Sequence, residues 1–215
     1  MMLFWKVILW LWGAYMVGSI PTSVWVGRLF HGVDVRDHGS GNAGATNTIR
    51  VLGLKTGIPV LVFDAFKGWI VVILAPLSGF FVPGSDAYVN FQLSMGISAV
   101  LGHLFPVYAG FRGGKGVATL FGVIIALFPG AFGLVLLLFA IIFAITRIVS
   151  LSSIIAAITF PVVVIFLFHV ETPSLILFSM VIAVFIPVTH QKNIVRLFRG
   201  EESRMVLKKP EKPTG

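Results

Sequence analysis

The sequence predicts an all-α integral membrane protein with seven transmembrane helices, its N-terminus outside and its C-terminus in the cytoplasm. Of its 215 residues 57% are hydrophobic and only 11% are charged, whereas an ordinary soluble domain carries about 25% charged residues. Uncharged runs such as Val7–Gly27 and Ile148–Phe168 are long enough to cross a bilayer, which takes roughly 20 residues. These runs are continuously apolar, so they indicate helices rather than the alternating strands of a barrel. Cys is absent, which excludes disulfides and thiolate metal sites.

Seven spans follow from the apolar runs, at approximately 3–27, 57–80, 88–106, 116–128, 131–146, 150–168 and 174–189. The long run 116–146 is divided at Pro129-Gly130, a turn signal, because one helix of that length would measure about 46 Å against a hydrocarbon core of about 30 Å. We expect the first span to be retained rather than cleaved as a signal peptide. It lacks a small-residue cleavage site and continues into a polar segment at 18–23.

The distribution of basic residues sets the orientation. With seven spans, 14 of the 16 Lys and Arg residues fall on one side, leaving only Lys6 and the intramembrane Lys67. The opposite loops carry Asp86 and Glu171 and no basic residue, so the basic side is predicted to be cytoplasmic. A six-span arrangement would separate Arg147 from the basic C-terminal tail. Basic residues spread between apolar runs do not form the soluble basic face that nucleic acid requires.

The domain organisation is simple. Residues 1–207 are predicted to form a single helical membrane domain, and residues 208–215 a polar, disordered tail.

The segment Gly39–Arg50 is unusual in so apolar a chain, whose mean hydropathy is +1.00. Glycines free backbone amides to point at an anion, and the guanidinium of an arginine pairs with phosphate oxygens. A flexible turn would explain the glycines alone, but not the accompanying polar residues. The segment therefore predicts a glycine-rich phosphate loop, with Ser40, Gly41, Asn42, Thr46, Asn47 and Arg50 as candidate ligands.

A second glycine-rich segment, Phe111–Gly116, superficially resembles a nucleotide-binding P-loop. It fails that pattern, because Ala109 stands where the first Gly is required and Gly116 where Ser or Thr would hold magnesium. ATP binding is therefore rejected. The exposed amides of Gly113 and Gly114, together with Lys115 before a helix, still predict an anion site.

Four further polar features stand out. Arg147 precedes Ser150, Ser152 and Ser153, of which at least one is expected to cap the next helix. His190, Asn193 and Arg196 share the spacing of one helix side. Asp64 and Lys67, three apart within a span, are interpreted as a structural ion pair, with a role in a polar site as the alternative. His103 is expected to be buried and hydrogen-bonded rather than a metal ligand.

Taken together, these segments resemble the bacterial acyl-phosphate:glycerol-3-phosphate acyltransferases, the PlsY family. The resemblance rests on GSIP at 18–21, DVRDHGSGNAGATNTIRVLG at 34–53, GHLFPVYAGFRGGKGVAT at 102–119, TRIVSLSSI at 146–154 and HQKNIVRLFRGEE at 190–202. It implies a multi-pass enzyme of the bacterial cytoplasmic membrane whose active site faces the cytoplasm. The implied reaction moves a fatty acyl group from acyl phosphate to the 1-hydroxyl of glycerol 3-phosphate, giving lysophosphatidic acid and phosphate. It implies no metal or cofactor, and suggests as a partner a soluble enzyme that makes the acyl phosphate.

The same resemblance implies residue roles. The catalytic set would be Ser40, Lys115, His190 and Asn193. The substrate-binding set would be Gly41, Asn42, Thr46, Asn47, Arg50, Gly113, Gly114, Ser150, Ser153, Arg196 and Glu202. Whether His190 or the phosphate of the donor accepts the proton stays open, as does which of the three serines contacts the substrate.

Two other function classes are weighed against this one. A transporter or flippase for an organic phosphate or lipid would use the same basic residues, but would need anion-binding groups on both faces. The outer loops carry none. A structural scaffold would leave the glycine-rich segments unexplained.

Overall fold

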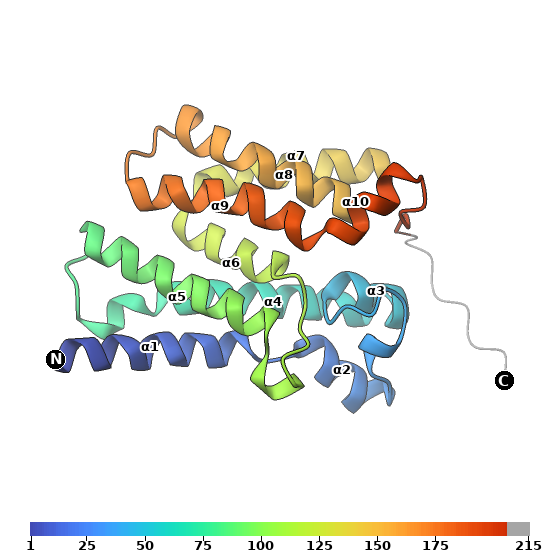
Figure 1. Ribbon diagram of the computed structural model, residues 1–215, viewed down its shortest axis with the longest axis horizontal. Coiled ribbons are helices and arrows are strands. Elements are labelled where there is room, and N and C mark those ends of the chain that lie inside the picture. Colours follow the sequence, from blue (N-terminus) through green and yellow to red (C-terminus); the bar gives the residue numbers. More distant parts are fainter. Residues whose placement is uncertain (206–215) are drawn as a thin grey trace.

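The computed structural model describes residues 1–205, and this part of the chain is helical throughout its regular structure (Figure 1). The tail predicted at 208–215, like the end of the membrane domain at 206–207, lies outside the described residues.

The N-terminal half contains five α-helices: α1 (Met2–Gly18), α2 (Thr22–His31), α3 (Ala45–Leu52), α4 (Leu54–Ile73) and α5 (Asp86–Leu104). Short 3-10 turns, η1 (Val35–Asp37) and η2 (Ala75–Ser78), lie between them. The first predicted span, 3–27, corresponds to the candidate membrane span Met2–His31, which is interrupted because α1 ends before Pro21 and α2 begins after it. Proline lacks the backbone N–H that would continue the helix. The carbonyl of Ile20 in this break instead accepts a hydrogen bond from Nζ of Lys67 at 2.9 Å.

The C-terminal half begins with the 3-10 turn η3 (Val107–Ala109). The helices that follow are α6 (Val117–Leu127), α7 (Pro129–Thr146), α8 (Val149–Val162), the π-helical η4 (Val163–Leu167), α9 (Pro173–Thr189) and α10 (Gln191–Phe198). The predicted break at Pro129 is confirmed, because α6 ends at Leu127 and Pro129 opens α7 after the single residue Phe128. Between α9 and α10 the chain bends by 64° at His190.

Within residues 1–205, five helices are long and apolar enough to cross a membrane, or six if α9 and α10 count as one bent span. The remaining predicted span corresponds to α6, which has 11 residues and measures about 16 Å at 1.5 Å per residue. Its length falls short of a hydrocarbon core of about 30 Å. Length and composition therefore support five or six of the seven predicted spans.

The helices pack in two groups with α6 between them (Figure 1). One group contains α1, α4 and α5, and the other α7, α8 and α9. Close packing of α4 on α6 depends on Gly68 and Gly122, where a Cβ atom would collide with the facing backbone. Small residues allow such close approach of membrane helices. This packing brings α2, α3, α10 and the start of α6 to the same end of the bundle.

A buried ion pair lies on α4, within the first group of helices. Nζ of Lys67 lies 2.8 Å from Oδ1 of Asp64, and both side chains are 2% exposed, so the predicted ion pair is confirmed. The hydroxyl of Thr22 donates to the same carboxylate at 3.0 Å. His103 is buried as expected, but its Nδ1 lies 3.7 Å from Asp64, which is longer than the hydrogen bond that we expected.

Candidate active site

Two loops form one side of the site. The first glycine loop, residues 32–44, connects α2 to α3, and the second glycine loop, residues 105–116, connects α5 to α6. Only the first half of the Gly39–Arg50 segment, up to Gly44, is a loop. From Ala45 onward the chain is helical as α3, so Thr46, Asn47 and Arg50 project from a helix rather than from a loop.

Asn47 shapes the first glycine loop from within. Its Nδ2 donates to the carbonyl of Val35 at 2.7 Å and to that of His38 at 3.1 Å. Its Oδ1 accepts from the backbone N–H of Ser40 at 2.8 Å and from the hydroxyl of Ser40 at 3.1 Å. These four bonds use both donors and both lone pairs of the buried amide. Asn47 therefore holds the loop that presents Ser40, and its contact with a substrate stays a prediction.

Ser40, Gly41, Asn42 and Thr46 remain accessible at the surface of this loop and of the first turn of α3. Gly39 and Gly41 have φ angles of 61° and 71°, a left-handed conformation that glycine adopts without steric cost. The two glycines therefore make the sharp turn that carries Ser40 outward.

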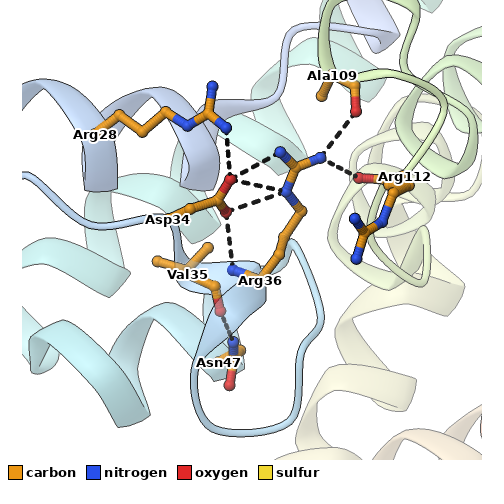
Figure 2. A network of polar contacts seen from close by, with 7 residues as sticks. All are labelled: Arg28, Asp34, Val35, Arg36, Asn47, Ala109 and Arg112. Atoms are coloured by element: carbon orange, nitrogen blue, oxygen red, sulfur yellow. Dashed lines mark hydrogen bonds and ion pairs between the residues drawn. The ribbon is translucent and has the colours of Figure 1, made fainter.

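Arg36 connects the two glycine loops, and sequence analysis did not single it out (Figure 2). Its guanidinium pairs with Asp34 at 2.8 Å, and its Nη1 donates to the carbonyl of Ala109 at 2.8 Å. The hydrogen bonds from Arg36 hold the pKa of Asp34 well below its usual range. The signal available in the sequence was the DVR triplet directly before the glycines, but nothing local shows what Arg36 reaches.

Glu202 organises the opposite side of the site. Its Oε1 accepts from Oγ of Ser150 at 2.9 Å and from Nδ2 of Asn193 at 2.6 Å. Its Oε2 accepts from Nε of Arg196 at 2.7 Å. Burial opposes ionisation of Glu202, but the hydrogen bonds from Arg196, Asn193 and Ser150 outweigh it and lower its pKa. An ionised carboxylate thus fixes three of the predicted site residues from two helices.

Lys115 reaches across to this cluster from the second glycine loop. Its Nζ donates to Oδ1 of Asn193, so the amide of Asn193 lies between Lys115 and Glu202. Burial lowers the pKa of Lys115 to about 8, against the opposing effect of Glu202, and the positive charges of Arg196 and Arg50 lower it further. Excess positive charge of this kind is what a bound phosphate would neutralise.

His190 lies buried at the bend between α9 and α10. Its Nδ1 is 2.8 Å from the carbonyl oxygen of Ile186. A carbonyl only accepts hydrogen bonds, so Nδ1 carries the proton and Nε2 of the neutral ring is left with a free lone pair. The ring can therefore accept a proton at Nε2.

The three serines of α8 have different surroundings. Ser150 donates to Glu202, whereas the hydroxyl of Ser152 donates back to the carbonyl of Ile148 in the previous turn, at 2.9 Å. Ser153 lines an apolar cavity. Of the three, Ser150 is thus the serine that belongs to the polar cluster.

The chain segment after α10 closes this side of the site. Nη2 of Arg50 donates to Oγ of Ser203 at 2.8 Å, and the backbone N–H of Met205 donates to the carbonyl of Arg147 at 2.8 Å. Sequence analysis missed Ser203, because a serine in a charged tail carries no distinctive signal. Arg50 of α3 is thereby linked to the segment that carries Glu202.

A small apolar cavity lies between four helices of the bundle. Residues of α6, α7, α8 and α9 line it: Val117, Leu120, Phe121, Ile124, Val135, Ser153, Ala156, Ala157, Phe160, Ile182 and Ile186. Ile186 also provides the carbonyl that orients His190. Ile186 is therefore a neighbour of both the cavity and the histidine. Among residues 1–205, no three His, Asp or Glu side chains gather as metal ligands would.

The geometry agrees with what comparison with known proteins shows. Residues 8–200 match the model of the glycerol-3-phosphate acyltransferase family. The glycerol-3-phosphate acyltransferase of Chlorobaculum parvum is 40% identical over 220 residues, covering 90% of this chain and 94% of that protein. The enzyme of Listeria monocytogenes serotype 4a is 43% identical over 192 residues, covering 89% of this chain and 93% of that protein.

Solved structures give the same result. The crystal structure of PlsY (YgiH), an integral membrane glycerol 3-phosphate acyltransferase, in its glycerol 3-phosphate form matches with a TM-score of 0.81 at 39% identity. The match covers 93% of this chain and 96% of the PlsY chain. The lysophosphatidic acid form of PlsY matches with a TM-score of 0.79 at 38% identity. The chain therefore belongs to the glycerol-3-phosphate acyltransferase family and is an integral membrane glycerol-3-phosphate acyltransferase.

Proposed function

We propose that the protein transfers a fatty acyl group from acyl phosphate to the 1-hydroxyl of glycerol 3-phosphate, releasing lysophosphatidic acid and inorganic phosphate. One observation carries this proposal. Lys115 is bonded to Asn193 between two groups of phosphate ligands, one on the first glycine loop and α3, the other on α8 and α10. Two phosphate-bearing substrates repel each other, and a shared cation between them offsets that repulsion.

The acceptor, glycerol 3-phosphate, is assigned to the side of the first glycine loop. Its phosphate would be held by Arg50 and Lys115, with Ser40, Asn42 and Thr46 as smaller donors. Arg50 is exposed, and among residues 1–205 its guanidinium bonds only to Ser203, through Nη2, which leaves most of the guanidinium available for a phosphate.

The donor is assigned to the side of Ser150, Asn193 and Arg196. The hydroxyl oxygen of the acceptor attacks the carbonyl carbon of the mixed anhydride, the new ester C–O bond forms, and the bond from that carbon to the phosphate oxygen breaks. The phosphate leaves with the electron pair and is stabilised by the cations that held it. Because an acyl phosphate is already activated, positioning and charge stabilisation supply most of the catalysis.

Two groups can accept the hydroxyl proton. One is Nε2 of His190, whose lone pair is free because Nδ1 bonds to Ile186. The other is the phosphate of the donor itself. Replacing His190 with Ala separates them. If His190→Ala retains turnover and its pH profile follows the titration of the donor phosphate, that phosphate accepts the proton. If kcat collapses while substrate affinity is unchanged, His190 accepts it.

The acyl chain is assigned to the apolar cavity between α6, α7, α8 and α9. The lining residue Ile186 of this cavity also contacts His190, and apart from Ser153 the lining side chains are aliphatic and aromatic. Burying the chain there stabilises the bound donor by about 0.8 kcal/mol for each CH₂ group removed from water.

The protein is further proposed to lie in the bacterial cytoplasmic membrane with seven spans, its N-terminus outside and the site facing the cytoplasm. The short α6 would be the seventh span. The positive-inside rule supports this orientation, because 14 of the 16 basic residues fall on the side of the site. A soluble enzyme that makes acyl phosphate would then reach the site from the cytoplasm.

Phosphate release by the purified protein in a lipid mesophase tests the proposal. With palmitoyl phosphate and glycerol 3-phosphate we expect release that falls about a hundredfold in Lys115→Ala, as for the loss of one charged transition-state contact. Palmitoyl-CoA should not replace palmitoyl phosphate as the donor. The two donors are compared by the formation of lysophosphatidic acid, because a thioester releases CoA and not phosphate. Equal rates with the thioester, or equal rates for Lys115→Ala and the parent, would refute the donor and the site respectively.

A further inference from the structure

The two glycine loops are far apart in the sequence, and one side chain holds them together. Nη1 of Arg36, on the first glycine loop, donates to the carbonyl of Ala109 at 2.8 Å and to that of Arg112 at 3.4 Å, both on the second glycine loop (Figure 2). Arg112 is followed by Gly113, Gly114 and Lys115. The anchor thus lies directly before the catalytic lysine.

Asp34 fixes the direction of this guanidinium. Its carboxylate accepts from Nε of Arg36 at 3.0 Å, from Nη2 at 2.8 Å and from the backbone N–H of Arg36 at 2.9 Å. The two side chains are only 11% and 10% exposed. Paired forks of this kind restrict both distance and angle, which a lysine could not do.

The hydrogen bonds of Arg36 engage most of its guanidinium in contacts within the protein. All three of its guanidinium nitrogens already donate to Asp34 or to the second glycine loop. Arg28 provides a contrast, because it pairs with the same carboxylate at 2.9 Å but is 60% exposed and belongs to α2. Of the side chains in residues 1–205, Arg36 is the one whose hydrogen bonds join the two loops.

The loops also meet beside the lysine. A Cβ atom on Gly114 would lie 2.9 Å from the carbonyl oxygen of Ala43, so the backbones touch there without a side chain between them. Small displacements of either loop would therefore alter the distance from Ser40 to Lys115. Neither Asn47, which holds only the first loop, nor the His103 carbonyl, which bonds Gly114 of the second, connects the two.

We propose that Arg36, oriented by Asp34, is a positioning residue that sets the separation of the two glycine loops and thereby the affinity for glycerol 3-phosphate. This inference rests on the proposed function in one respect, the assignment of glycerol 3-phosphate to these loops. It assigns Arg36 no contact with either substrate.

Calorimetric titration of the detergent-solubilised protein with glycerol 3-phosphate, without any donor, tests this proposal. We expect Arg36→Gln to raise the dissociation constant for glycerol 3-phosphate about tenfold or more, since misplacing a binding group by about 1 Å can cost a hundredfold in rate. The matched control Arg28→Gln should bind within about twofold of the parent. A role only in folding would lower the binding stoichiometry or the melting temperature but leave the dissociation constant unchanged.

Unchanged affinity in a folded Arg36→Gln protein, or an equal loss in Arg28→Gln, would overturn the proposal. Should Arg36→Gln not fold, Asp34→Asn provides the same test, because it removes the charge that orients the guanidinium but keeps the bonds to the second loop. It should weaken binding at least threefold, and parent-like affinity would again overturn the proposal. Lys115→Ala is titrated in parallel. If Lys115→Ala binds glycerol 3-phosphate as the parent does, glycerol 3-phosphate binds elsewhere and the proposed function fails. If only Arg36→Gln and Asp34→Asn keep the parent affinity, the positioning role alone fails.

Discussion

The ammonium of Lys115 donates a hydrogen bond to the amide oxygen of Asn193, although the two residues are 78 positions apart in the chain. The other end of the same amide donates to Glu202 at 2.6 Å. Asn193 therefore connects the second glycine loop to the C-terminal segment. Because an amide has one accepting and one donating end, it can link an ammonium to a carboxylate without adding charge.

The first prediction concerns this link. Asn193→Ala should lower kcat/KM about a hundredfold, because it removes a bond to Lys115 and leaves part of Glu202 unpaired. Steady-state phosphate release measures the effect. Gln191→Ala, an exposed change on the same helix α10, should stay within about twofold of the parent. Comparable losses in both variants would argue against a specific role for the amide.

The second prediction is a pH dependence. The pKa of Lys115 is lowered to about 8, chiefly by burial, so the free enzyme loses this positive charge as the pH rises through about 8. The profile of kcat/KM against pH should therefore fall on the alkaline side from about pH 8, since kcat/KM reports the free enzyme. In Lys115→Arg the guanidinium stays protonated, and this alkaline decline should disappear from whatever activity remains. The same decline in both proteins would assign it to another group.

The third prediction uses the neighbouring glutamates. Glu202 raises the pKa of Lys115 by its negative charge, so Glu202→Gln should move the alkaline decline to lower pH. It should also lower kcat/KM about tenfold or more, because Arg196 loses a charged partner at 2.7 Å. Glu201→Gln is the matched control, since Glu201 is exposed. An alkaline decline that stays at the same pH in Glu202→Gln would contradict the electrostatic coupling.

The fourth prediction concerns the acyl cavity. Ala157 lines the cavity and is 6% exposed, so Ala157→Phe should fill part of it. We expect the KM for palmitoyl phosphate to rise about tenfold while that for octanoyl phosphate changes little, because only the longer chain needs the occupied volume. Ala144→Phe, on the exposed side of α7, should alter neither value. A uniform change for both donors would place the acyl chain elsewhere.

The sequence by itself determined the features that depend on neighbouring residues. Apolar runs predicted most of the helices, Pro129 predicted the break between α6 and α7, and three-residue spacing predicted the pair of Asp64 and Lys67. These signals are local, because a helix places residues three or four apart on one side wherever it lies in the protein.

Only the tertiary structure decided which polar residues bond within a loop and which meet across the site. It turned Asn47 inward to hold its loop, separated Ser150 from Ser152 and Ser153, and brought Arg36 to Ala109, 73 residues away. Serines two or three positions apart look alike in a sequence, and a glycine-rich segment does not show which amides face inward. Those outcomes depend on which helices pack together, and close packing at Gly68 and Gly122 fixes one of those contacts.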